Sequence, residues 1–266
     1  MATAEAPITV KRFMEMKSAG HKITMVTAYD YPMARLADEA GVDGILVGDS
    51  LAMVVQGHDT TLPATMQQML YHAEMVGRAV RRALVVVDMP FMSYQLGVRE
   101  ALKNAGRVLK QTRCQAVKLE CGPNQAELVA ALVQAGIPVM AHLGLRPQSV
   151  HQMGGYSIQR DRQQLLEDSR AVQQAGAFAI LLECIPAELA AEITASVQVP
   201  TIGIGAGPHC DGQIQVLHDL LGLTLGRRPR HAKAYTDLKT TIQQALAQYC
   251  QEVREGVFPA LEHSFR

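Results

Sequence analysis

The sequence predicts an α/β fold, a (β/α)8 barrel, for the chain of 266 residues. Short runs rich in Val, Ile and Leu alternate with longer segments of helical period. The runs are nearly continuous in apolar residues, which is typical of parallel strands covered on both faces. About eight such units follow one another without a linker or a low-complexity stretch, which favours a barrel. A doubly wound open sheet is the alternative, because a sequence does not show whether a sheet closes.

The predicted strands are the apolar runs themselves. In chain order they are Ile23–Ala28, Gly44–Val47, Ala83–Val87, Ala116–Leu119, Pro138–Ala141, Ala177–Leu182 and Pro200–Ile204, with Gly222–Leu225 as a weak eighth.

Helix start and stop signals lie between these runs. Thr65 with Gln68 forms a capping box, in which each residue satisfies a backbone N–H of the other. The same signal, with Asn or Asp as the cap, recurs in the pairs Asn124–Glu127 and Asp161–Gln164. Three predicted helices end in Ala-Gly, where glycine supplies the left-handed cap that turns the chain back. These ends are Ala40-Gly41, Ala135-Gly136 and Ala175-Gly176.

Two more helices are predicted outside the repeating units. Thr9–Ala19 is expected to be a leading helix that plugs the barrel floor, and Thr236–Arg254 a closing helix. One face of the closing helix carries Ile242, Leu246, Tyr249 and Val253. Because no shift in composition divides the chain, we expect a single domain over residues 1–266.

Composition excludes several classes of protein. The hydrophobic fraction of 48% is too high for a disordered chain. Lys+Arg and Asp+Glu are equal at 25 each, so the basic surface of a general nucleic-acid binder is not expected. The five scattered cysteines suit a reducing compartment. Without a secretory signal or an apolar run near ~20 residues, we expect a cytoplasmic protein with neither nucleic-acid nor membrane partners.

Almost every predicted strand ends in a residue that can do chemistry. Because the carboxyl ends of barrel strands meet on one face, these residues are expected to converge there. Each alone has an ordinary explanation, since an Asp after a strand often caps the next helix and a single His is often a core residue. Their joint pattern favours an active site. The residues are Asp30, Asp49, Asp88, Glu120, His142 and Glu183.

Three of these acids suit a magnesium ion. Asp49, Asp88 and Glu120 offer oxygen ligands without a thiolate, which favours Mg²⁺ over zinc. Lys118 lies two residues before Glu120, so both side chains are expected to point into the barrel. A lysine there can hold a substrate carboxylate, form a Schiff base or pair with Glu120, and the residue types leave these roles open.

Two further motifs have ordinary explanations beside functional ones. The loop Gly203–Gly207 fits either phosphate binding or, more often, close backbone packing. The basic run Arg227–Lys233 is typical of a solvated loop or a subunit contact, and it lacks the interleaved aromatic residues of a nucleic-acid site.

A set of short motifs runs in order along nearly the whole chain, from about Ile8 to its end. They are TAYDY at 27–31, LVGDSL at 46–51, QGHDTTLP at 56–63, DMPFM at 88–92, VKLE at 117–120, HLGL at 142–145, PQS at 147–149, GGY at 154–156, LLEC at 181–184, IGIGAG at 202–207, DGQ at 211–213 and EHSF at 262–265. Together they are specific, and with them the sequence resembles the ketopantoate hydroxymethyltransferase family.

The resemblance implies a (β/α)8 barrel of the phosphoenolpyruvate/pyruvate type in a homo-oligomer, commonly a decamer. It implies a hydroxymethyltransferase, which moves a one-carbon group from 5,10-methylenetetrahydrofolate to 3-methyl-2-oxobutanoate through a Mg²⁺-stabilised enolate. The product is 2-dehydropantoate (ketopantoate), an intermediate of pantothenate and coenzyme A biosynthesis. Only the resemblance supplies the folate, because no pattern in the residues points to a pterin.

The resemblance also implies roles for individual residues. Glu183 matches the proton acceptor of the family. The implied metal ligands are Asp49, Asp88 and Glu120, the last of them acting directly or through water. The implied substrate-binding residues are Asp49, Ser50, Asp88 and Lys118, to which we add His142 from the HLGL motif.

Two competing functions remain open from the residues. A Mg²⁺-dependent lyase or mutase of the same barrel group would act on 2-methylisocitrate-like or phosphonopyruvate-like substrates, but its typical KKCGH-like loop is absent from the sequence. A catalytically silent barrel used for binding or assembly is disfavoured, because every proposed catalytic position holds a chemically competent residue.

Overall fold

The structure is a computed structural model that describes residues 6–122 and 125–265. The chain forms two compact units, Met1–Gln215 and Val216–Arg266. The first unit holds all eight strands of the barrel, and the second holds helices. The single domain expected over residues 1–266 stays a prediction.

Eight parallel strands form a closed barrel in sequence order, each pairing with the next. Strand β8 pairs with both β7 and β1, which closes the sheet. The predicted barrel is therefore confirmed, and the open doubly wound sheet is wrong. The strands are β1 (Ile23–Thr27), β2 (Gly44–Val47), β3 (Leu84–Asp88), β4 (Ala116–Glu120), β5 (Val139–Gly144), β6 (Ala179–Glu183), β7 (Thr201–Ile204) and β8 (Gly212–Gln215).

The eighth strand lies earlier in the chain than predicted. Strand β8 is Gly212–Gln215, whereas the predicted Gly222–Leu225 forms no strand. Two glutamines interrupt the apolar run in β8, and Ile214, which is 5% exposed, is its one residue in the barrel core. The segment at 222 turns instead, because Gly222 adopts a left-handed φ of +69° just after a helix.

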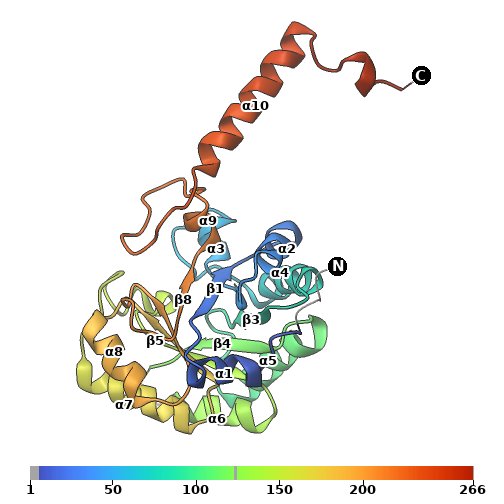
Figure 1. Cartoon of the computed structure of the whole chain (residues 1–266). Coiled ribbons are helices and arrows are strands. Elements are labelled where there is room, and N and C mark those ends of the chain that lie inside the picture. The colour runs from blue at the N-terminus through green and yellow to red at the C-terminus, as the bar shows by residue number, and fades with distance from the viewer. Residues whose placement is uncertain (1–5, 123–124, 266) are drawn as a thin grey trace. The chain divides into compact units, whose positions relative to one another are not determined.

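Helices surround the barrel strands (Figure 1). The capping box of Thr65 and Gln68 is confirmed at the start of one of them, and Asp161 caps another as predicted. The predicted Asn124 cap lies outside the described residues. Helices of the first unit are α1 (Val10–Ser18), α2 (Tyr31–Glu39), α3 (Leu51–Val54), α4 (Met66–Ala79), α5 (Val98–Gln111), α6 (Ala126–Gln134), α7 (Arg162–Gln174) and α8 (Ala187–Ser196), with a 3-10 turn η1 (Pro147–Ser149) after β5.

The leading helix α1 closes the amino-terminal end of the barrel, as predicted. Its Phe13 is fully buried and meets the ring of Phe178 edge-on, with 5.8 Å between ring centroids. Phe13 also belongs to the apolar core that includes Ile23 and Leu84, which begin their strands. Burying a phenylalanine of this kind stabilises the fold by roughly 1.5–3 kcal/mol. The amino-terminal end is therefore a packed floor, and chemistry is left to the opposite end.

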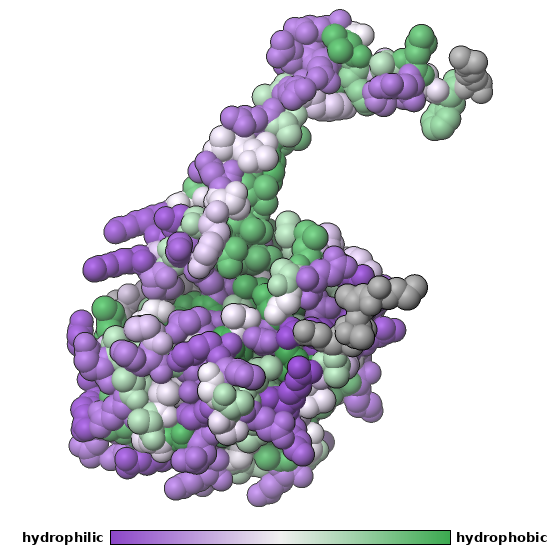
Figure 2. All heavy atoms as spheres, in the orientation of Figure 1, coloured by the Kyte–Doolittle hydropathy of each residue, from purple (hydrophilic) through white to green (hydrophobic). Residues whose placement is uncertain are grey.

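The second unit contains α9 (Leu217–Leu220), α10 (Leu238–Glu255) and a 3-10 turn η2 (Leu261–His263). The predicted carboxyl-terminal helix is confirmed in α10, although none of its residues is buried. Figure 2 shows hydrophobic residues along one side of this helix. The exposed apolar side chains are Ile242, Leu246, Tyr249 and Val253. Among the described residues, no helix is long and apolar enough to cross a membrane.

Candidate active site

The inward-pointing side chains of four strands change from apolar to ionisable near the carboxyl end of the barrel. Side chains two residues apart share a face of a strand, so each ionisable residue continues an apolar row of the core. These rows are Val86 then Asp88 on β3, Ala116 then Lys118 and Glu120 on β4, Met140 then His142 on β5, and Leu181 then Glu183 on β6. Strand pairing then sets Asp88 beside Lys118 and Glu120 beside His142.

Lys118 and Asp88 form a buried ion pair, with 2.6 Å between the ammonium nitrogen and Oδ1. The other carboxylate oxygen of Asp88 accepts a hydrogen bond from the backbone N–H of Asp49 at 3.1 Å. Burial alone would lower the pKa of Lys118, but the carboxylates of Asp88, Asp49 and Glu120 together raise it. The lysine therefore stays protonated, which disfavours the free amine that a Schiff base requires.

The carboxylates of the cluster outnumber its cation. Asp49, two residues beyond β2, is 5% exposed, and Glu120 is 4% exposed. Burial and the neighbouring Asp88 raise the pKa of Asp49 to about 7. Burial and Asp49 raise the pKa of Glu120 well above its usual value. Buried carboxylates that share one lysine are costly to ionise, so the cluster favours a further positive charge.

The donor set of this cluster fits a divalent ion that prefers oxygen. Among the described residues, no three His, Cys, Asp or Glu side chains already converge as a closed metal site. Mg²⁺ does not need such a cage, since it usually takes one or two carboxylates and completes its coordination with water or substrate. Asp49 and Asp88 can hold the ion in that way. One oxygen of Asp88 already accepts a hydrogen bond from the backbone N–H of Asp49, which keeps the two acids together. The roles of Asp49, Asp88 and Glu120 as ligands stay a prediction.

His142 connects Lys118 to Glu183. Its Nδ1 lies 3.4 Å from the Lys118 ammonium, and its Nε2 lies 3.2 Å from Oε2 of Glu183. Burial and Lys118 lower the pKa of His142 well below its usual value, so the imidazole is neutral. The nitrogen that faces an ammonium has to accept, which leaves the proton on Nε2. Nε2 forms no hydrogen bond with a described residue, although Oε2 of Glu183 is close to it. The sequence placed these residues in one cluster, but it did not reveal this pairing.

The backbone around Glu183 is tightly constrained. The carbonyl of Glu183 accepts from the N–H of Leu145 at 2.9 Å. A Cβ on Gly144 would lie 2.2 Å from that carbonyl oxygen, so only glycine allows this approach. Cys184, the next residue, adopts a left-handed φ of +49°. Strained backbone conformations of this kind are found most often at functional sites. The Glu183 side chain is 18% exposed, whereas the side chains of Asp88 and Glu120 are each 4% exposed. Glu183 is therefore the most accessible of these three acids.

Ser50 lies beside the cluster at the start of α3. Its hydroxyl forms a hydrogen bond with the Tyr29 hydroxyl at 2.8 Å. Burial raises the pKa of Tyr29, so this phenol keeps its proton. A Cβ on Gly48 would lie 2.7 Å from the Ser50 hydroxyl, so that glycine gives the serine its room. The predicted contact between Ser50 and substrate remains a prediction.

Two sequence candidates do not join the cluster. Asp30 caps α2 and accepts from the backbone N–H of Met33 at 2.8 Å, which is its ordinary structural role. In the Gly203–Gly207 loop, a Cβ on Gly207 would lie 2.4 Å from Cβ of Ala187. Close packing therefore accounts for a glycine at this position.

One residue that the sequence analysis does not single out occupies the centre of the cluster. Gln148, in η1, is 6% exposed, and its backbone N–H donates to both oxygens of Glu120 at 3.2 and 3.1 Å. Its side-chain amide donates to Oδ2 of Asp49 at 2.9 Å. The PQS motif at 147–149 contains it, but an uncharged amide gives no chemical signal comparable to that of an acid.

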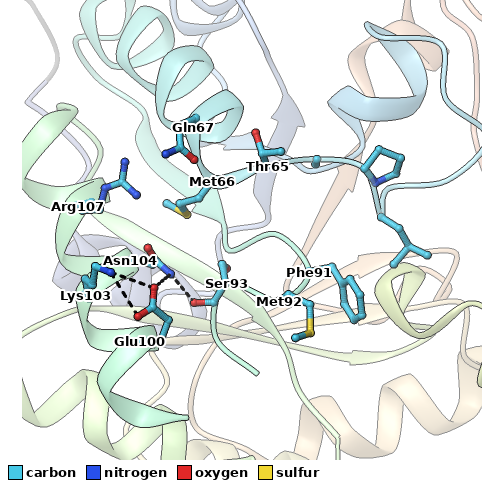
Figure 3. A pocket seen from close by; sticks show the side chains of 13 residues that line it. Thr65, Met66, Gln67, Phe91, Met92, Ser93, Glu100, Lys103, Asn104 and Arg107 are labelled. Atoms are coloured by element: carbon cyan, nitrogen blue, oxygen red, sulfur yellow. Dashed lines mark hydrogen bonds and ion pairs between the residues drawn. The ribbon is translucent and has the colours of Figure 1, made fainter. Parts of the chain in front are cut away.

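A pocket of about 570 Å³ lies outside the buried cluster, between the start of α4, the loop after β3 and α5 (Figure 3). None of its lining residues belongs to the cluster. Asn104 on α5 donates to the Ser93 carbonyl at 2.8 Å and to Glu100 at 3.3 Å, as the dashed lines in Figure 3 mark. The bond to Ser93 ties the loop that follows Asp88 to α5 in the outer helix layer.

Comparison with known sequences agrees with the resemblance seen in the motifs. Residues 7–261 match the family model described as ketopantoate hydroxymethyltransferase. The chain is 55% identical over 258 residues to the 3-methyl-2-oxobutanoate hydroxymethyltransferase of Rhodopirellula baltica, covering 97% of this chain and 96% of that protein. It is 56% identical over 262 residues to the protein of the same name from Carboxydothermus hydrogenoformans, covering 97% and 95%.

Comparison with solved structures supports the barrel. One similar structure is a 2,3-dimethylmalate lyase of the PEP mutase/isocitrate lyase superfamily, with a TM-score of 0.64, 17% identity and coverage of 98% of this chain and 89% of that chain. Another is a phosphonopyruvate hydrolase complex with oxalate and Mg++, with a TM-score of 0.63, 14% identity and coverage of 96% and 92%. At these identities the likeness shows the fold alone. The sequence matches, in contrast, extend over nearly the full length of the chain. They show that the chain belongs to the ketopantoate hydroxymethyltransferase family.

Proposed function

We propose that this enzyme transfers a hydroxymethyl group from 5,10-methylenetetrahydrofolate to 3-methyl-2-oxobutanoate, giving 2-dehydropantoate for pantothenate and coenzyme A biosynthesis. The observation that carries the proposal is the buried cluster of acids, lysine and histidine at the carboxyl end of the barrel. Relatives at 55–56% identity bear the name of this transferase. With water as the source of the hydroxyl oxygen, tetrahydrofolate is the second product.

The cluster suits a 2-oxo acid only when further positive charge is present. Asp49, Asp88 and Glu120 would bind Mg²⁺, directly or through water, which would polarise the keto carbonyl and offset the charge that develops as the adjacent carbon loses its proton. Lys118 supplies the fixed ammonium at the carboxylate end of the substrate, where the Ser50 hydroxyl can also donate. Asp88 holds that ammonium in place at 2.6 Å.

Glu183 is the proposed proton acceptor. It removes the proton from C3 of the 2-oxo acid, and the electron pair of that C–H bond then forms the new C–C bond to the one-carbon unit. His142 supports this role, because a neutral imidazole with its proton on Nε2 faces Oε2 of Glu183 at 3.2 Å. A neutral imidazole beside the carboxylate adds no charge that would keep it from accepting a proton.

We propose a homo-oligomer, a decamer by resemblance to the family, in the cytoplasm. The exposed apolar face of α10 supports self-association, because large exposed apolar stripes usually mark contact surfaces. All five cysteines are free, which agrees with a reducing compartment.

The test is consumption of 3-methyl-2-oxobutanoate that depends on methylenetetrahydrofolate, with Mg²⁺, Mn²⁺ and Zn²⁺ compared after chelation of the purified protein. We expect turnover with Mg²⁺. Turnover of a different 2-oxo acid alone would favour a lyase or mutase. Loss of all turnover in folded protein would favour the silent binding module.

A second test addresses the metal ligands. Asp49→Ala and Asp88→Ala should weaken Mg²⁺-dependent substrate binding in calorimetry. Asp30→Ala is the control, since Asp30 also follows a strand but caps α2, and its loss should cost only about 1 kcal/mol of stability. A wild-type protein whose substrate binding does not depend on metal would overturn the Mg²⁺ assignment.

A further inference from the structure

We propose that Gln148 is a positioning residue for the metal-binding carboxylates, which sets the orientation of Asp49 and Glu120 at once. The inference rests on the Mg²⁺ site of the proposed function and deepens it. In this role Gln148 acts through the two acids to which it donates.

The position of Gln148 lets a single residue bridge two strands. It lies in η1, which follows β5, whereas Asp49 follows β2 and Glu120 ends β4. Its backbone N–H reaches both oxygens of Glu120, and its Nε2 reaches Oδ2 of Asp49 at 2.9 Å. The residue is only 6% exposed, so water does not compete strongly for these bonds. Two acids that repel each other are therefore held by donors of the same residue.

The amide of Gln148 has only one orientation that satisfies its neighbours. Nε2 faces Oδ2 of Asp49 and the carbonyl of Met89, at 2.9 and 3.0 Å, and both of these accept hydrogen bonds. The amide oxygen faces the Tyr94 hydroxyl at 2.9 Å and Nε2 of Gln95 at 3.2 Å, and both of these donate. A flipped amide would set oxygen against oxygen on one side and donor against donor on the other.

Tyr94 is the second part of this arrangement. It is 1% exposed, and burial together with Glu120 raises its pKa well above the usual value, so the hydroxyl keeps the proton that it donates. The hydroxyl bond to the Gln148 oxygen fixes which end of the amide faces Asp49.

The consequence for Asp49 is a division of its two oxygens. Gln148 occupies Oδ2, while none of the described residues donates to Oδ1. Oδ1 is thus the oxygen left for a metal ion, and its direction is set by the bond on the opposite oxygen. Residues that orient metal ligands in this way typically contribute about 10- to 100-fold to metal affinity.

The experiment measures Mg²⁺ binding to metal-free protein by calorimetry, without substrate, in the wild type and in Gln148→Met. Methionine keeps the length and the backbone N–H but removes both side-chain donors. We expect Mg²⁺ to bind about 10- to 100-fold more weakly. In assays, the Mg²⁺ concentration needed for half-maximal rate should rise by the same factor, while kcat at saturating Mg²⁺ stays near the wild-type value.

Two further variants separate positioning from general stability. Gln115→Met makes the same exchange at the other end of the barrel, where Gln115 accepts from the N–H of Val85, and it should leave Mg²⁺ affinity unchanged. Tyr94→Phe keeps Gln148 but removes the hydroxyl that orients its amide, and it should weaken Mg²⁺ binding by a smaller factor. This variant still tests the inference if Gln148→Met fails to fold.

Wild-type Mg²⁺ affinity in folded Gln148→Met or in Tyr94→Phe would overturn the positioning role while leaving the proposed function intact. A wild-type protein that binds no Mg²⁺ would instead overturn the metal site of the proposed function, and the positioning role with it. Equal weakening in Gln115→Met would also overturn the role, because the effect would then follow stability rather than position.

Discussion

The ammonium of Lys118 lies 2.6 Å from Oδ1 of Asp88, and the two side chains are only 6% and 4% exposed. Strand pairing sets the two residues directly opposite each other on β3 and β4. Asp49 and Glu120 also act on this ammonium. One buried cation thus balances part of the charge of three carboxylates.

Lys118→Met should therefore destabilise the metal-free protein by about 3–5 kcal/mol, because removing one partner leaves buried carboxylates without their cation. The free energy of unfolding in urea measures this loss. Lys103→Met is the matched control, since Lys103 pairs with Glu100 at the surface and should cost no more than about 1 kcal/mol. Equal losses in the two variants would contradict the importance of the buried pair.

The stability of the metal-free protein should depend on pH through Asp49. Its pKa is about 7 in the fold, whereas it is about 4 in an unfolded chain. Below about pH 4 both states are protonated, and the contribution of Asp49 to stability is at its most favourable. Between about pH 4 and 7 the folded protein keeps a proton that the unfolded chain has released. That contribution is lost as the pH rises from about 4 to 7, by up to about 1.4 kcal/mol per pH unit.

Asp49→Asn removes this titration. The free energy of unfolding is measured in urea and a chelating buffer. Between pH 4 and 7 the wild type should lose stability relative to Asp49→Asn, and above pH 7 the difference should stay constant. A difference that is constant over this range would contradict the raised pKa.

The cysteines should differ sharply in reactivity. Burial raises the pKa of Cys114 to about 11, of Cys121 to about 12 and of Cys184 to about 11, so these thiols stay protonated at pH 8. Cys250 on α10 is exposed. A thiol-specific reagent at pH 8 should modify Cys250 first in folded protein diluted to single chains, and all five cysteines after denaturation. A fast reaction that persists in Cys250→Ser would contradict this order.

The sequence predicted those parts of the fold that depend on apolar patterning. Seven strands are nearly continuous apolar runs, and the ionisable residues at their carboxyl ends mark the site, so Asp88, Glu120 and Glu183 could be found. Strand β8 could not be found, because Gln213 and Gln215 interrupt its pattern and its place depends on pairing with the distant β1 as well as with β7.

The contacts within the site were beyond the sequence for a different reason. The pairing of His142 with Glu183 depends on the register between β5 and β6, and no local pattern encodes it. Gln148 joins acids that are 99 and 28 residues away along the chain. An uncharged amide becomes informative only when its donors and acceptors are seen against their partners.

The apolar face of α10 should be required for self-association. Leu246 is 59% exposed in the single chain, and its burial against another copy would release the cost of this exposure. Leu246→Glu should lower the molar mass measured by light scattering, with helix content unchanged. Gln244→Glu, which lies about half a turn away on the helix, is the control and should leave the mass unchanged. A monomeric wild type would contradict the proposed oligomer.

Glu183→Gln should stop proton removal from the substrate and leave binding nearly intact. The amide keeps the size of the side chain but has no basic oxygen, so exchange of the C3 proton of 3-methyl-2-oxobutanoate with D2O should fall by about 10²- to 10⁴-fold. Proton NMR follows this exchange without the folate, which separates deprotonation from transfer. Calorimetry should give Mg²⁺ and substrate affinities close to those of the wild type, because Lys118 and the acids of β2–β4 are unchanged.

The matched control for this variant is Glu188→Gln, which makes the same exchange at an exposed position in the first turn of α8, five residues away. It should keep the wild-type exchange rate. If Glu183→Gln exchanges the C3 proton at the wild-type rate, Glu183 is not the base, because the glutamine amide has no basic oxygen that could accept the proton. His142 would then be the next candidate for the base, because its Nε2 lies 3.2 Å from Oε2 of Glu183. The proton on that nitrogen would first have to leave.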